Sequence, residues 1–142
     1  KPSRLNEDKI RLEWLEKGTD TYFNAHALSD GTLRFICLAT LLLMPDPPAT
    51  IIIDEPELGL HPYAISVLAA LLRRASQHTQ VIVSTQSVTL VNQFEPEDIV
   101  VVDREDDQSV FSRPDVQALS AWLEDYGTGD LWEKNLLGGR PR

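Results

Sequence analysis

An apolar run that ends in two acids is the feature of this sequence with the clearest chemical potential. Ile51, Ile52 and Ile53 are followed directly by Asp54 and Glu55. A strand that is apolar at every position is typical of a parallel sheet covered on both faces, and open α/β sheets bind ligands at the carboxyl ends of such strands. There an Asp can hold Mg²⁺, and a following Glu can orient or deprotonate an attacking water molecule. A simple strand-ending turn is the alternative interpretation.

A second polar segment precedes a long apolar one. Residues 33–44 are apolar on almost every face and are followed by three prolines, which predicts a buried helix with Ser29 as its N-cap. The first amides of a helix lack intrahelical partners, and the helix dipole is positive there. The start of this helix is therefore a candidate anion site, at which Gly31 would let a phosphate approach the backbone closely.

A third segment repeats the pattern of a buried strand with a polar end. Residues 80–83 lead into Ser84, Thr85, Gln86 and Ser87. The carboxyl ends of parallel strands lie at one edge of a sheet, so Thr85, Gln86 and Ser87 are expected beside the acids at 54 and 55. Two strand ends and one helix start are thus predicted to converge.

In this order the three segments resemble the motifs of an ABC-type ATPase head. LSDGT at 28–32 resembles the signature motif, IIIDEPELGLHP at 51–62 the Walker B motif with its D-loop, and VIVSTQS at 81–87 the switch region. The sequences of these motifs are most similar to those of the branch that contains RecF, SMC and OLD-type proteins and many bacterial AAA family ATPases. The resemblance covers about residues 27–102, with a weaker likeness beyond.

The resemblance implies a fold, two cofactors and a partner. The fold is α/β, a fragment of a P-loop NTPase head with a mostly parallel, buried sheet flanked by helices and a small antiparallel arm at the N-terminus. The cofactors are ATP and Mg²⁺, with ATP held between the heads of a head-to-head homodimer. Ser29 and Gly31 would act in trans on the γ-phosphate, Asp54 would hold Mg²⁺ through water, Glu55 would polarise the attacking water, and His61 would lie in the D-loop at the dimer seam.

Three departures from the family pattern qualify this reading. Asp30 replaces the usual Gly of the signature, and we expect its carboxylate to point away from phosphate and cap backbone amides. Gln86 replaces the usual switch His, and an amide can bind a phosphate or water but cannot titrate near neutral pH, so we expect slow or less pH-sensitive hydrolysis. No G-x-x-x-x-G-K-[ST] phosphate loop occurs in the 142 residues. The chain is therefore predicted to supply half of a head and to need an N-terminal Walker A half as a partner.

Length and composition predict a single domain over residues 1–142. Its expected parts are arm strands at 1–26, the three motifs at 27–102, and a C-terminal hairpin and helix at 103–142. No apolar stretch reaches the length of a membrane span, and no signal-peptide pattern opens the sequence. The absence of Met at position 1 suggests a fragment of something longer.

The net charge and the cysteine content limit which binding partners and which cellular compartment are expected. The net charge of −9 argues against a broad nucleic-acid footprint on this segment, so DNA or an effector protein would bind through other regions. The single cysteine, Cys37, excludes an internal disulfide and is expected to be a small buried hydrophobe, which fits a reducing cytoplasm.

The remaining pattern predicts elements that surround the motifs. Alternation over residues 10–17 indicates a half-exposed strand that forms a hairpin with residues 22–23, and Pro62 starts a helix whose apolar residues recur at helical spacing. Residues 99–102 are expected to form a third buried strand, residues 103–107 an acidic turn, and Asp115 the cap of a further helix.

Three functions remain open from the sequence. The first is an ATPase that hydrolyses MgATP with Glu55. The second is a module in which ATP controls dimerisation or regulation and hydrolysis is vestigial because of Gln86. The third is an ABC transporter ATPase subunit, which the GLHP sequence after the acids disfavours.

Overall fold

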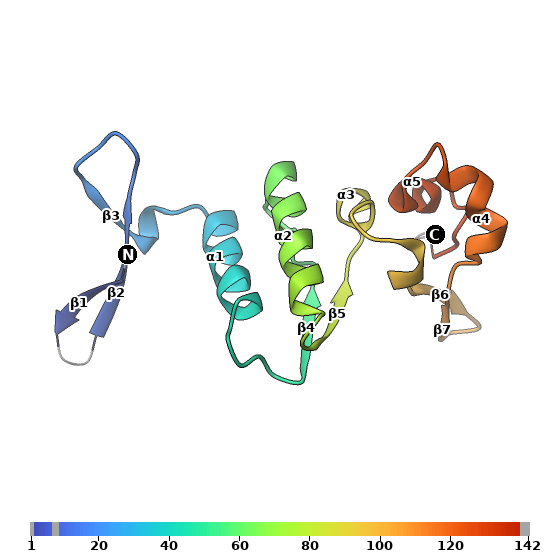
Figure 1. The fold of residues 1–142 in the computed structure, drawn as a ribbon, viewed down its shortest axis with the longest axis horizontal. Helices are drawn as coiled ribbons and strands as arrows, with labels where there is room; N and C mark the ends of the chain where they lie inside the picture. Colours follow the sequence, from blue (N-terminus) through green and yellow to red (C-terminus); the bar gives the residue numbers. More distant parts are fainter. Residues whose placement is uncertain (1, 7–8, 140–142) are drawn as a thin grey trace.

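A computed structural model describes residues 2–6 and 9–139, with side chains described from residue 11 onward. The elements follow one another along the long axis nearly in chain order, from an N-terminal sheet to a C-terminal group of helices and a hairpin (Figure 1). The strands are β1 (Pro2–Asn6), β2 (Lys9–Leu15), β3 (Tyr22–Asn24), β4 (Thr50–Asp54), β5 (Gln80–Ser84), β6 (Val101–Glu105) and β7 (Gln108–Ser112). The helices are α1 (Asp30–Leu42), α2 (Pro62–Ala75), α3 (Val88–Val91), α4 (Val116–Leu123) and α5 (Thr128–Glu133), with the 3-10 helices η1 (Ala25–Ala27) and η2 (Pro96–Asp98).

The N-terminal sheet is the antiparallel arm that the sequence predicts. Its strand order is β1-β2-β3, and both strand pairs are antiparallel. Trp14 of β2 pairs with Phe23 of β3, so the predicted hairpin is confirmed.

The central unit consists of the parallel pair β4–β5 with α1 and α2 packed on one side. Proline at the first position of α2 fits a helix start, because its missing N–H has no intrahelical acceptor there. The buried residues of α2 recur at helical spacing as predicted, and they are Ile65, Leu68, Ala69, Leu72 and Ala75. Several of them form a core with Ile51 of β4 and Leu42 of α1.

The prediction of a mostly parallel sheet buried on both faces is wrong for this chain. Among the described residues the strands form three separate sheets, and only β4–β5 is parallel. Ile51 is 4 % exposed, whereas the next residue, Ile52, is 75 % exposed. The reason is that α1 and α2 supply side chains only to the core on the Ile51 side. The apolar sequence of β4 is therefore suited to burial on both faces, but the described residues cover only one of them.

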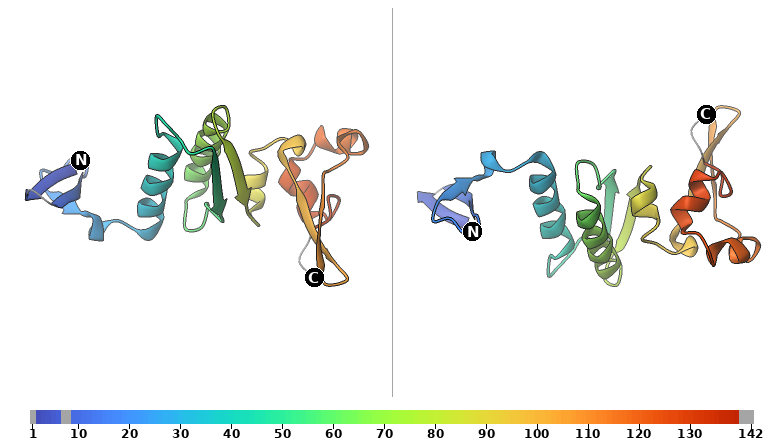
Figure 2. Two further views of the ribbon diagram at one scale, coloured as in Figure 1. Left: turned by 90° about the horizontal axis from the view of Figure 1, so that it is seen from below. Right: turned by 90° about the horizontal axis from the view of Figure 1, so that it is seen from above.

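Helix α1 is less buried than predicted. Ser29 is its N-cap, as expected, but Leu42 is the one buried residue of this helix, and the prediction that Cys37 is buried is wrong because its side chain is exposed. One face of α1 packs beside α2, and among the described residues no element packs on the outer face (Figures 1 and 2).

The C-terminal part differs from the prediction in its third strand. That strand begins at Val101 rather than at residue 99, and it pairs antiparallel with β7 instead of joining the parallel pair. The turn of this hairpin is limited to Asp106 and Asp107, whose φ angles of 45° and 64° match the mirror-image turns that join antiparallel strands. Asp115 caps α4 as predicted, by accepting hydrogen bonds from two backbone amides.

A polar clasp joins α5 to α3. Oδ1 of Asn92 accepts a 2.7 Å hydrogen bond from the N–H of Gly129, and Nδ2 of Asn92 donates to Asp130. The hydrogen bond from Asn92, followed by one from the backbone N–H of Gly127, holds the pKa of the Asp130 carboxyl below its ordinary value. Beside the clasp, Leu90 and Leu131 are fully buried.

Candidate functional site

The carboxyl ends of β4 and β5 lie side by side, as the sequence predicts. The two strands pair in register, with Asp54 opposite Ser84. The hydroxyl of Ser84 donates a hydrogen bond to Oδ1 of Asp54, while the Asp54 side chain remains exposed. The candidate metal ligand is therefore oriented by the neighbouring strand and accessible to solvent.

Glu55 adopts an unusual backbone conformation. Its φ angle is 42°, in the left-handed region that a residue other than glycine occupies at a cost of about 1–3 kcal/mol. Two hydrogen bonds hold it there: its N–H donates to the carbonyl of Ser84 at 2.9 Å, and its carbonyl accepts from the guanidinium of Arg34 at 3.2 Å. Strain of this kind is concentrated at functional sites, so the geometry supports a role for Glu55 that does not come from packing alone.

Glu57 is a functional candidate that the sequence analysis missed. It is 8 % exposed and is the one acidic side chain that is buried in the described part of the chain. Its Oε1 accepts a hydrogen bond from the hydroxyl of Thr85, and its Oε2 has no partner among the described residues. The available signal was the third acid of the DEPE sequence. Glu57 links the loop after Asp54 to the segment that carries Gln86.

The start of α1 lies against the loop that follows Glu57. The Ser29 hydroxyl accepts a hydrogen bond from the N–H of Thr32 at 3.2 Å. A Cβ atom on Gly31 would stand 2.2 Å from the carbonyl oxygen of Gly59, so only glycine fits this contact. The close approach that Gly31 makes in this chain is thus to Gly59, and its predicted approach to a phosphate stays a prediction.

His61 has a local structural role. Its Nδ1 accepts a hydrogen bond from the N–H of Tyr63 at 3.2 Å, so His61 caps α2. The side chain is exposed at the end of the D-loop segment. This cap is compatible with the predicted position at a dimer seam but does not test it.

Three of the predicted site residues share one cavity. Asp54, Glu55 and Gln86 line a cavity of about 1430 Å³, together with Ser84 and Thr85. Ser29, Gly31 and His61 do not line it. The structure therefore separates the predicted residues into a group at the strand ends and a group at the start of α1 and in the loop before α2.

The strand-end group fits a magnesium ion in part. Mg²⁺ prefers oxygen ligands, keeps several waters, and is commonly bound by one or two carboxylates together with substrate phosphates. An exposed Asp54 carboxylate beside the Ser84 hydroxyl is a suitable donor set of this kind. In the described residues no group of three or more His, Cys, Asp or Glu side chains could hold a metal ion by itself.

Comparison with known proteins places the chain in a family. The model of the family described as "AAA domain, putative AbiEii toxin, Type IV TA system" matches residues 2–92, more than half of the chain. The chain belongs to this AAA domain family. The matched range includes all three motifs, so the family assignment covers every predicted site residue.

A solved structure has a similar fold. It is described as "Structural biochemistry of ATP-driven dimerization and DNA stimulated activation of SMC ATPases", with a TM-score of 0.63 and 20 % sequence identity. The similarity covers 82 % of this chain and 72 % of that chain. Together with the family assignment, this similarity supports an α/β fold of the P-loop ATPase type.

No helix within residues 2–6 and 9–139 combines the length and the apolar character that crossing a membrane requires.

Proposed function

We propose that this chain is the signature and Walker B part of an ABC-type ATPase head of the RecF, SMC and OLD-like branch, acting in the cytoplasm. The observation that carries the proposal is the convergence of Asp54, Glu55 and Gln86 on one cavity at the carboxyl ends of a parallel strand pair. Ligands of open α/β sheets bind at such ends. Membership of the AAA domain family supports the same assignment.

The residues at the strand ends have distinct roles in the proposed hydrolysis. Asp54, oriented by Ser84, would hold Mg²⁺ through water, and the ion would supply positive charge against the phosphates of the nucleotide. Glu55 accepts a proton from the attacking water, and the Arg34 contact to its carbonyl fixes the strained backbone that aims its side chain. The Gln86 amide hydrogen-bonds the water or the γ-phosphate.

The remaining residues act on a nucleotide held by a second head. Ser29, Gly31 and His61 lie outside the cavity that Asp54 and Glu55 line. Both groups can touch the same nucleotide if two heads face each other, with the α1 start of one head opposite the strand ends of the other. The contact between Gly31 and Gly59 supports this arrangement, because it fixes the signature helix and the D-loop as one surface.

The phosphate cradle comes from a segment outside residues 1–142. No phosphate-loop sequence occurs in the chain, and the start of α1 offers backbone amides but no lysine at that point. The Walker A half of the head is therefore the obligatory partner for ATP binding. DNA or an effector protein would contact other regions, since the charge of −9 makes this segment a poor electrostatic match for nucleic acid.

Gln86 supports a second candidate function, an ATP-controlled dimerisation or regulatory module with vestigial hydrolysis. Its side chain is exposed at the cavity, and an amide cannot take up a proton from water near neutral pH. The two candidates agree on ATP binding and differ only in turnover.

Glu55→Gln in the complete head tests the proposal. Removing the base should abolish turnover while Asp54 keeps the metal site, so the variant should accumulate as a nucleotide-bound dimer in size-exclusion chromatography with ATP. If the wild type hydrolyses ATP rapidly and Glu55→Gln retains turnover within a factor of a few, water activation lies elsewhere. If both proteins hydrolyse ATP slowly and equally, the result favours the regulatory module.

Ser29 provides the matched test of the dimer. If Ser29 is an ordinary N-cap, Ser29→Ala should cost about 1 kcal/mol of stability and leave nucleotide-dependent assembly unchanged. Ser29→Arg should abolish ATP-driven dimerisation while binding of ATP to the single head survives, because the side chain would fill the amide pocket of the opposing phosphate. Normal dimers of Ser29→Arg would remove the signature assignment.

A further inference from the structure

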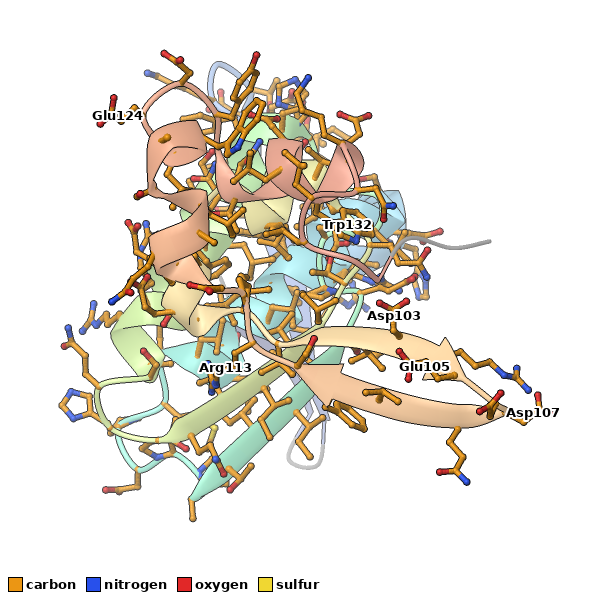
Figure 3. All side chains as sticks on the ribbon, turned by 90° about the vertical axis from the view of Figure 1, so that its right-hand side faces the viewer. Asp103, Glu105, Asp107, Arg113, Glu124 and Trp132 are labelled. Atoms are coloured by element: carbon orange, nitrogen blue, oxygen red, sulfur yellow. The ribbon has the colours of Figure 1, made fainter. Side chains whose placement is uncertain are left out.

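Glu57 differs from the other acids of the chain in its surroundings. It is 8 % exposed, whereas Asp107 at the tip of the β6–β7 hairpin and Glu124 at the end of α4 are exposed and point away from the molecule (Figure 3). Removing an acid from water is unfavourable unless hydrogen bonds compensate for it. Among the described residues Oε1 of Glu57 has a partner and Oε2 has none. Packing alone therefore gives no reason for an acid at this position.

The loop that carries Glu57 has a fixed backbone. Pro56, the preceding residue, is fully buried, and its ring restricts the backbone dihedral angle. The Glu57 carbonyl accepts a 3.0 Å hydrogen bond from the N–H of Leu60, and the Glu55 carbonyl accepts one from the N–H of Leu58 at 3.3 Å. The side chain of Glu57 therefore extends from a rigid turn and can impose a position on the group that it contacts.

A chain of hydrogen bonds runs from Glu57 to the backbone next to Gln86. The Thr85 hydroxyl donates to Oε1 of Glu57, and the same hydroxyl oxygen accepts a 3.0 Å hydrogen bond from the N–H of Ser87. Because a hydroxyl has one donor and two acceptor lone pairs, its donation to Glu57 orients the lone pair that Ser87 uses. Ser87 in turn caps α3 by accepting from the N–H of Leu90. Residue 86 thus lies between two residues that the Thr85 hydroxyl connects.

The position of Gln86 depends on this backbone. Its side chain is exposed and borders the cavity that Asp54 and Glu55 also line, so close packing does not hold it in place. A group that orients a reactant must be placed accurately, since a displacement of about 1 Å can reduce a rate about 100-fold. The hydrogen bonds around residues 85–87 supply a means of placing it.

We propose that Glu57 is a positioning residue that acts through Thr85 and Ser87 to hold the Gln86 amide beside the strand-end acids. The role rests on the proposed function, because it is defined by the water or phosphate that Gln86 would contact. An ionised carboxylate is a stronger acceptor than a neutral group, which explains why an acid is retained in a buried place. Glu57 itself touches neither reactant, so its loss should affect turnover rather than ATP affinity.

Turnover by the complete head separates positioning from packing. Glu57→Leu removes both oxygens but keeps an apolar side chain of similar size, so the urea midpoint should be unchanged or higher. Its kcat should fall about tenfold or more, with KM for ATP within about twofold of the wild type. Glu57→Gln keeps an oxygen that can accept from Thr85 and should recover most of the lost kcat. Wild-type kcat in Glu57→Leu, or an equal loss in both variants, would overturn the proposal.

Thr85→Val tests the same hydrogen bond from its other end. It removes the hydroxyl at nearly constant shape and should reproduce the kcat of Glu57→Leu. The double variant should lose no more than either single variant, because both break one interaction. Thr89→Val, at an exposed position of α3, is the matched control and should keep wild-type kcat. Losses that multiply in the double variant would show that the two residues act independently, which contradicts the proposal.

Amide hydrogen exchange of the complete head without nucleotide gives a readout that needs no turnover. The Ser87 amide should exchange about tenfold faster in Glu57→Leu than in the wild type or Glu57→Gln, because the Thr85 hydroxyl is free to rotate. The amide of Leu68, fully buried in α2, is the internal control. Faster Ser87 exchange with no ATP turnover even in the wild type would keep the hold on residue 86 and reject the hydrolase assignment. Wild-type turnover with equal Ser87 exchange in all three proteins would keep that assignment and reject the role of Glu57.

Discussion

Ile51 and Ile52 are neighbouring residues of the same type on β4, yet one is 4 % and the other 75 % exposed. On the Ile51 face, α1 and α2 supply a core with fully buried Leu68. On the Ile52 face the register partner is Ile82, which is also exposed. Both faces carry sequence suited to burial, but the described residues cover only the face of Ile51.

The largest expected effect is a difference between these two isoleucines. Ile51→Ala should lower the free energy of unfolding by about 3 kcal/mol, because it leaves a cavity in the core. Ile52→Ala should change it by less than about 0.5 kcal/mol, as for other exposed positions. Urea unfolding followed by circular dichroism measures both. Similar losses would show that the two faces are equally packed in solution.

The contact between Gly31 and Gly59 gives the next effect. Gly31→Ala should lower the free energy of unfolding by about 2 kcal/mol, because the new methyl group would meet the Gly59 carbonyl oxygen. Helix propensity alone predicts the opposite sign, since alanine in a helix is favoured over glycine by about 1 kcal/mol. Cys37→Ala on the exposed side of α1 is the control and should be nearly neutral. A stabilised Gly31→Ala variant would refute the packing of the signature helix on the loop.

Backbone strain at Glu55 should produce a smaller change of opposite sign. Glu55→Gly should raise the free energy of unfolding by about 1 kcal/mol, because glycine tolerates a φ of 42°. Glu55→Gln keeps the strain and should leave stability unchanged. Both variants should lack hydrolysis in the complete head. Equal stability of Gly and Gln variants in urea unfolding would show that residue 55 relaxes in solution.

The smallest effect concerns the clasp between α3 and α5. The pKa of the Asp130 carboxyl is lowered in the folded state, so its contribution to stability is present above the ordinary carboxyl value of about 3.9 and is lost as the pH falls through the lower folded value. The difference in urea midpoint between the wild type and Asp130→Asn should stay constant from pH 5 to 8, because the carboxyl is ionised throughout that range. The difference should shrink below about pH 4. A difference that grows on acidification would reverse the sign and contradict the clasp.

Local signals in the sequence were sufficient for most elements. Ser29, Pro62 and Asp115 mark helix starts through capping chemistry that depends only on nearby backbone groups, and the structure confirms each. The in-register ends of β4 and β5 were predictable because parallel strands place their carboxyl ends together.

Long-range partners were not predictable from the same signals. The burial expected for Cys37, and for Val100 and Val102 beside the buried Val101, assumed covering elements that the described residues do not supply. The buried pairing of Glu57 with Thr85 depends on the path of the loop after Pro56, which leaves no periodic pattern in the sequence. The roles of Ser29, Gly31, His61 and the division of residues 1–142 into parts stay predictions.

Calorimetry of MgATP with the 142-residue chain tests the central claim most directly, with the longer polypeptide that includes the Walker A half as the comparison. The account predicts no measurable heat of binding for the chain alone, because the lysine and most of the backbone cradle for the phosphates come from the other half. It predicts saturable binding once that half is present. Micromolar binding of MgATP by the chain alone would contradict the account.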